Sequence, residues 1–264
     1  MKKEMLLLAA LVLFVAAGVA SAVETASGDL GIEVDFTWVS KYLWRGFDLL
    51  DDKAAFQPSV NFDLFDSGWS ASVWYSTAGS SKNGGSLSTV DAEEFNYAVT
   101  YSNSLCEGQA TQTDYAASYI YYDFPDVASN DADQQEFNIG FSWPEICPFG
   151  TVPSYTIVYI WSAEGGGANR DIEGFIHVFG INKDIEVDCL ENPVSFSWDL
   201  TYNDDAGRAN VDHDWSHTTF GLSTSFDGIG SGTLTPGIFY QISMDDSVNT
   251  QNELWTGISY ALSF

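Results

Sequence analysis

Two basic side chains close a segment whose other charged positions are acidic. In residues 31–45, Glu33 and Asp35 alternate with apolar residues, and Lys41 and Arg45 keep the same odd-numbered spacing. If the segment is one β-strand, its period of two puts all four charges on one face. Cations at a narrow point of a pore orient anionic solutes and set the field across it. These four residues are therefore the first candidates for a functional site.

Ion pairs with carboxylates on other strands would give the two cations a structural role instead. The candidate acids for Lys41 and Arg45 are Asp63, Asp199 and Glu136, each on the polar face of its own alternating segment. Acidic residues outnumber basic ones 37 to 9, which favours such pairing over a free basic patch. The basic constriction stays open as the alternative.

Aspartates gather in the polar stretches between the alternating segments. Clusters of carboxylate oxygens can bind Ca²⁺ or Mg²⁺, but none of these clusters has the spacing of an EF-hand, and acidic loops are commonly only solvated. A metal site is therefore the weaker alternative, although attraction of cations follows from the charge alone. The weak candidate ligands are Asp131, Asp133, Asp204, Asp205, Asp212 and Asp214.

The three cysteines, Cys106, Cys147 and Cys189, lie in connections between segments. An exported protein can form a disulfide, but three is an odd number, so at least one thiol is left without a partner in the chain. Their spacing does not match a zinc site. One disulfide and three inert thiols are the alternatives.

A catalytic role would need a nucleophile with a base. His217 lies near Ser223 and Ser225 in the sequence, but spacing by two in strands makes such coincidences common. The sequence contains no GxSxG, no HExxH and no glycine-rich phosphate loop. We therefore expect neither an enzyme nor a bound cofactor.

The elements that must position these residues are β-strands, because the apolar period is two nearly everywhere. In residues 194–202, large apolar side chains alternate with serine, aspartate and threonine. Twelve such segments are predicted, at 31–45, 56–65, 69–77, 94–101, 114–123, 136–143, 154–162, 173–181, 194–202, 218–226, 233–243 and 253–264.

An even number of strands suits a bacterial transmembrane β-barrel, whose two ends lie on the same side of the membrane. The odd-numbered connections are rich in Asp, Asn, Ser and Gly, whereas even-numbered ones include the tight turn Asp66-Ser67-Gly68. The three cysteine-bearing even connections are longer than usual. The pattern predicts one all-β domain over residues 23–264, a single up-and-down antiparallel barrel.

Both ends of the chain agree with export to the bacterial outer membrane. Residues 1–22 have two lysines, an apolar stretch and a small-x-small exit, the form of a cleaved signal peptide. The last strand puts Tyr260, Leu262 and Phe264 on one apolar face and ends on the aromatic. In outer-membrane barrels this ending serves as the signal for membrane insertion.

Charge limits the partners. The full chain carries a net charge of −28, and removal of residues 1–22 makes the remaining chain slightly more acidic, so nucleic acid is excluded as a partner. The expected partners are outer-membrane lipid and lipopolysaccharide, the barrel-assembly machinery during insertion, and small solutes.

The stretch Val39-Ser40-Lys41-Tyr42-Leu43-Trp44-Arg45-Gly46-Phe47, followed by Gln57-Pro58-Ser59-Val60-Asn61-Phe62, resembles the first hairpin of the TorF family of porin-like proteins. Tyr119-Ile120-Tyr121-Tyr122-Asp123-Phe124-Pro125 resembles the tyrosine-rich strand found midway in that family. The resemblance implies an outer-membrane barrel with a channel role, and names no solute.

The sequence as a whole predicts a porin-like channel for passive diffusion of small solutes. Twelve strands lie between filled eight-stranded barrels and open porins of 16 to 18 strands, so a narrow or plugged pore is open as an alternative. A non-conducting surface barrel with acidic, cation-attracting loops is the rival function. The expected lumen-lining residues are Ser59, Asn61, Asp63, Ser70, Ser72, Asn96, Thr100, Asn138, Ser195, Ser197, Asp199, Thr201 and Ser259.

Overall fold

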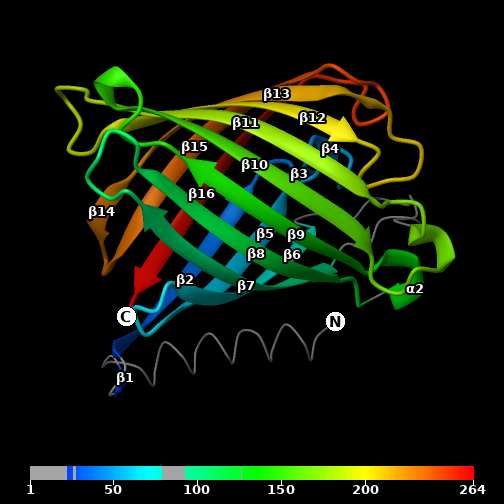
Figure 1. Cartoon of the computed structure of the whole chain (residues 1–264), viewed down its shortest axis with the longest axis horizontal. Helices are drawn as coiled ribbons and strands as arrows, with labels where there is room; N and C mark the ends of the chain where they lie inside the picture. The colour runs from blue at the N-terminus through cyan, green and yellow to red at the C-terminus, as the bar shows by residue number, and fades with distance from the viewer. Residues whose placement is uncertain (1–22, 26–27, 79–92, 126) are drawn as a thin grey trace.

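The computed structural model describes residues 23–25, 28–78, 93–125 and 127–264; the predicted signal peptide lies outside these residues. Twelve long antiparallel strands form a closed barrel in chain order, as predicted (Figure 1). They are β2 (Gly28–Val39), β5 (Ala55–Leu64), β6 (Trp69–Ala78), β7 (Glu93–Leu105), β8 (Thr113–Asp123), β9 (Gln134–Ser142), β10 (Thr151–Ser162), β11 (Gly174–Ile185), β12 (Val194–Asp204), β13 (His213–Thr224), β15 (Gly232–Ser243) and β16 (Glu253–Ser263).

The last strand closes the barrel against the first. In the register of β16 and β2, Ile258 lies opposite Trp38 and Leu262 opposite Val34. The backbone N–H of Phe264 donates to the carbonyl of Ile32 at 2.8 Å, which extends the seam to the end of the chain. Because β2 also pairs with β5, every long strand has two neighbours and the sheet has no free edge among them.

The period of two separates the two faces of the sheet. One face carries large apolar side chains that are partly exposed, including Trp38, Phe56, Tyr97, Tyr119, Phe137, Phe179, Phe220, Leu222, Ile238, Tyr240 and Ile258. The other face carries short polar side chains and glycine, and Asp35 lies opposite Ser59 there. The strand register places every predicted lumen-lining residue on this second face.

Connections differ in length at the two ends of the barrel. The end that holds the start of β2 and the end of β16 has the tight turn between β5 and β6, the 3-10 turn η1 (Pro148–Gly150) and the short strand β14 (Phe226–Ile229), and β1 (Val23–Thr25) pairs with β2 there. The opposite end has longer loops that include α2 (Ser129–Ala132) and η2 (Gly167–Asn169). Within the described residues, no helix is long and apolar enough to cross a membrane.

The prediction of one strand over 31–45 is wrong at its end. Strand β2 stops at Val39, and a separate two-stranded hairpin follows, β3 (Leu43–Trp44) paired with β4 (Phe47–Asp48). The other segments agree with the strands to within five residues, the largest difference being the start of β13 at His213 instead of 218. Lys41 and Arg45 therefore do not share a strand face with Glu33 and Asp35.

Candidate functional site

The segment 40–54, called here the lumen hairpin, folds into the barrel. Trp44 and Phe47 pair across a two-residue turn made by Arg45 and Gly46, whose φ angles are 51° and 95°. Positive φ at both central positions is what a type I′ hairpin turn requires, and glycine adopts it at no steric cost. A Cβ at Gly46 would also lie 2.5 Å from His217 Nδ1 on β13. Only glycine fits this close approach.

Apolar side chains anchor the hairpin inside the barrel. Phe47 is 0% exposed and packs with Val211 and Val248, while Trp44 packs edge-on against Tyr122 of β8. Trp44 also contacts a second buried cluster, made of Val158, Ile160, Ile172, Ile176 and Ala206. The lumen is therefore filled at this level by a packed core and not by water alone.

An ion pair joins the tip of the hairpin to β9. The Arg45 guanidinium lies 2.7 Å from Glu136 Oε1, and the Glu136 side chain is 0% exposed. Tyr122 and Asn138 donate hydrogen bonds to the same carboxylate at 2.8 and 2.7 Å. Burial opposes the charge of Arg45, but Glu136 and Tyr122 outweigh it and raise the pKa of the guanidinium. The pairing predicted for Arg45 and Glu136 is thus present.

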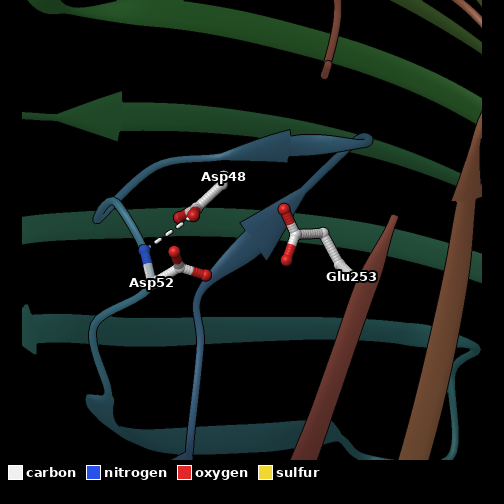
Figure 2. A group of neighbouring side chains, drawn as sticks. All are labelled: Asp48, Asp52 and Glu253. Atoms are coloured by element: carbon white, nitrogen blue, oxygen red, sulfur yellow. Dashed lines mark hydrogen bonds between the residues drawn. The ribbon is translucent and has the colours of Figure 1, made fainter. Parts of the chain in front are cut away.

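A second ion pair joins the base of the hairpin to β16. The Lys41 ammonium donates to Glu253 Oε2 at 2.6 Å and also bonds Asp52. Asp48 accepts from the backbone N–H of Asp52 at 2.7 Å, and Figure 2 shows the Asp48, Asp52 and Glu253 carboxylates turned toward one another. The hydrogen bonds that Lys41 donates to Asp52 and Glu253 raise its pKa.

The two ion pairs reach opposite walls. Around the ring of twelve strands, β16 and β9 are six positions apart. Between them, Gln241 of β15 donates to the carbonyl of Gly46 at 3.0 Å, and Tyr42 donates to Glu94 of β7 at 3.0 Å. The lumen hairpin therefore spans the cross-section of the barrel.

Cavities lie on both sides of the lumen hairpin. The one toward the long loops has a volume of about 220 Å³ and is lined by Tyr42, Trp44 and Arg208 among others. The other has a volume of about 190 Å³ and is lined by Arg45, Asp199 and other residues of the wall. Space large enough for several waters thus approaches the hairpin from either end.

Two other predicted lumen acids, Glu33 and Asp35, have neutral partners. Glu33 accepts from Asn61 at 3.3 Å and Asp35 from Thr37 at 2.6 Å. Asp63 lies on the same face in an exposed position at the end of the barrel that holds the two chain ends. The structure therefore brings together Arg45 and Glu136, but it leaves these acids apart from both cations of the hairpin.

The six weak metal candidates are not gathered into one site. Asp133 is buried and accepts from Tyr121 and from the backbone of Phe124, whereas the remaining acids lie in separate loops and strand ends. In the part of the chain that the structure describes, only Asp48, Asp52 and Glu253 have the spacing of metal ligands. The Lys41 ammonium already bonds two of these three carboxylates.

The remaining predicted groups stay separate. Cys106, Cys147 and Cys189 are free thiols in three different connections at the end of the barrel that holds the two chain ends, so the structure contains no disulfide between them. His217 hydrogen-bonds Ser216 at 2.9 Å and faces the lumen hairpin. The serine that hydrogen-bonds His217 is thus Ser216. Ser225, which the sequence suggested as a partner, hydrogen-bonds Thr235 instead.

Sequence reasoning missed the residues that hold the hairpin: Asp52, Glu253 and Gln241. A signal is present in the sequence, because the stretch 40–54, predicted partly as strand and partly as acidic loop, contains the apolar residues Trp44, Phe47, Leu49 and Leu50. Apolar side chains at that density need a buried partner.

Solved structures share this architecture. A KdgM porin aligns with a TM-score of 0.51 at 9% identity, over 88% of this chain and 99% of its own. The fold is that of outer-membrane porins. A NanC porin gives a TM-score of 0.50 at 13% identity over 88% of this chain and 98% of its own. The COG4313 outer-membrane channel from Pseudomonas putida F1 gives 0.52 at 9% identity over 94% and 98%.

No protein-family model matches the sequence, and no curated protein matches it either. Membership of the TorF family therefore stays a prediction. At these identities the solved barrels inform about the fold alone.

Proposed function

We propose that this protein is a channel of the bacterial outer membrane for passive diffusion of small solutes, narrowed by the lumen hairpin. The partly exposed apolar outer face suits lipid contact, and the short polar side chains on the inner face leave room for water. Cleavage of residues 1–22 and insertion through the barrel-assembly machinery belong to the same proposal. Lipopolysaccharide would surround its outer half.

The proposal is supported by the contacts that hold the hairpin inside the lumen. Two ion pairs, Lys41 with Glu253 and Arg45 with Glu136, fix a segment that enters and leaves the lumen from the same end of the barrel. Cavities approach it from both sides. A small displacement of this segment would join them into one path.

A planar-bilayer recording tests the channel. The purified full-length barrel should give stepwise currents of small size, and the double variant Lys41→Ala with Arg45→Ala should give larger ones because the hairpin loses both ion pairs. Circular dichroism checks that the variant keeps its β-structure. Absence of current from both proteins, each folded, would contradict the channel.

A non-conducting barrel is the second candidate, and one observation favours it. The lumen hairpin packs its apolar side chains across the cross-section, with Phe47 0% exposed. On this reading the acidic loops bind cations or a surface partner. The same recording separates the two functions.

The solute of a structural neighbour does not transfer to this chain. One KdgM porin was solved with disordered oligogalacturonate, which is a polyanion. Here the strands present acids to the lumen, and like charges repel across a low-dielectric pore. The residues that line this chain's own lumen must determine the chemical class of the solute.

A further inference from the structure

We infer that the channel selects cations, with Asp199 and three acids of β2 and β5 as the residues that set the preference. The inference rests on the proposed channel function and names the solute class for the same lumen. It depends on the charges that face the lumen, on their partners and on the cavity below the hairpin.

The wall on the side of the chain ends carries acids at successive depths. Glu33 and Asp35 of β2 face the lumen, and Asp63 of β5 lies opposite Gly31 on the same face. Asp199 of β12 lies deeper, opposite Gly180 and Thr219. Asp114 and Asp184 share this inward register.

No basic side chain of the described strands balances the negative charge of this wall. Among the described residues, no lysine or arginine occupies a lumen-facing position of the twelve strands: Lys183 lies opposite Phe196, on the apolar face. Arg170 and Lys53 lie in loops, where Lys53 bonds the backbone of Asp51. Arg208 is the third cation at the level of the hairpin: it stacks on Phe47, its guanidinium carbon 4.4 Å from the ring centre, and lines the cavity toward the long loops.

The two cations of the hairpin itself are already neutralised. Lys41 bonds two carboxylates, Asp52 and Glu253, and Arg45 bonds Glu136. With Asp48, which lies beside Asp52 and Glu253, four acids at this level outnumber the three bases Lys41, Arg45 and Arg208. The lumen therefore keeps a net negative charge even at the level of the hairpin, where a basic constriction was the alternative prediction.

Asp199 has the position that matters most for a passing ion. Asp199 lines the cavity of about 190 Å³ directly below the hairpin, together with Thr201 and with Arg45, whose charge Glu136 balances. No described residue donates a hydrogen bond or an ion pair to this carboxylate, whereas Glu33 and Asp35 accept from Asn61 and Thr37. An unshared carboxylate at the narrow part of a pore lowers the energy of a cation there.

Recordings in a KCl gradient test the inference. The wild-type barrel should show a reversal potential of the sign expected for K⁺ permeation, with K⁺ several times more permeant than Cl⁻. Asp199→Asn should lower that ratio, and the set Glu33→Gln, Asp35→Asn, Asp63→Asn and Asp199→Asn should bring it close to one. Unit conductance in the wild type should also fall on addition of Mg²⁺, since a divalent cation occupies an acidic pore longer.

Glu173→Gln is the matched control. Glu173 is exposed and accepts from Tyr159, which lies in the outward register of β10, so its neutralisation removes one charge without touching the lumen. Its permeability ratio should equal that of the wild type. Anion preference in a conducting wild type, or an equal ratio for wild type and the set of four, would overturn the inference while leaving the channel intact. Absence of any current would instead contradict the channel itself.

Discussion

Single residues decide whether the lumen hairpin stays in place. Arg45 is 26% exposed and Glu136 is 0% exposed, so the carboxylate has no contact with water to replace a lost partner. Tyr122 and Asn138 complete its hydrogen bonds. Such a pair is costly to break on one side, because the remaining charge stays buried.

Arg45→Met should therefore lower the free energy of unfolding of the barrel. We expect a loss of about 2 kcal/mol, below the roughly 3–5 kcal/mol of fully buried pairs because the guanidinium keeps some solvent contact. Urea unfolding followed by tryptophan fluorescence measures it. The double variant Arg45→Met with Glu136→Gln should recover part of the loss, and a double variant as unstable as the single one would contradict the assigned pairing.

The Lys41 ion pairs predict an alkaline transition. Bonds to Asp52 and Glu253 raise the pKa of Lys41, so the stabilisation is complete below the ordinary lysine pKa of about 10.4 and is lost as pH rises through the raised value. Conductance of the wild type should increase in that alkaline range. The neighbouring Tyr42 stays neutral there, because burial and Glu94 raise its pKa well above normal.

Lys41→Arg is the matched control for the alkaline transition, since arginine keeps its charge throughout that range. Its conductance should stay flat with pH. A rise of equal size in this variant would assign the transition to another group.

At the scale of elements, the hairpin is a separate unit added to a regular meander. Strands β2 and β5 pair directly from Val39 with Ala55 to Leu30 with Leu64, so the sheet is complete without residues 40–54. A connection of that length is far longer than a barrel needs. Its removal should leave the sheet closed.

Replacement of residues 41–53 by a short Gly-Ser linker should raise the unit conductance several-fold. The reason is that Trp44 and Phe47 leave the lumen together with both ion pairs. The circular dichroism spectrum should keep the band that indicates β-strands. A linker variant that folds yet conducts no better than the wild type would show that the constriction lies elsewhere.

At the scale of the whole molecule, the polar and apolar faces are reversed relative to a soluble barrel. The period of two predicts one apolar and one polar face for every strand. The form of residues 1–22 and the aromatic end of the last strand predict that the apolar face looks outward. Twelve segments, their order and the inward register of Asp199 and Ser259 followed from the same pattern. Patterns of this kind are local, so they describe strands well.

The lumen hairpin could not be predicted this way, because its contacts join residues far apart in the sequence. Lys41 and Glu253 are separated by 212 positions, and Arg45 and Glu136 by 91. The alternation of charges at Glu33, Asp35 and Lys41 continued past Val39 by coincidence. Pairing of Arg45 with an acid was foreseen, but Asp52 and Glu253 were not.

The end of the chain yields a prediction for assembly. Phe264 exchanges backbone hydrogen bonds with Ile32, which lengthens the seam between β16 and β2. Deletion of Phe264 should reduce the amount of barrel in the outer-membrane fraction several-fold, measured by fractionation and immunoblotting. Phe264→Tyr, which keeps the aromatic ring and the backbone, should assemble like the wild type; an equal yield from the deletion would contradict the role of this residue.

The ion pairs to β9 and β16 also have a mechanical consequence. A thin-walled cylinder of twelve strands flattens easily when the surrounding lipid presses on it, since bending the wall stretches few bonds. The lumen hairpin, which bonds Glu136 on β9 and Glu253 on β16, connects opposite sides of that cylinder. Release of the hairpin should therefore both widen the path and allow the cross-section to become elliptical.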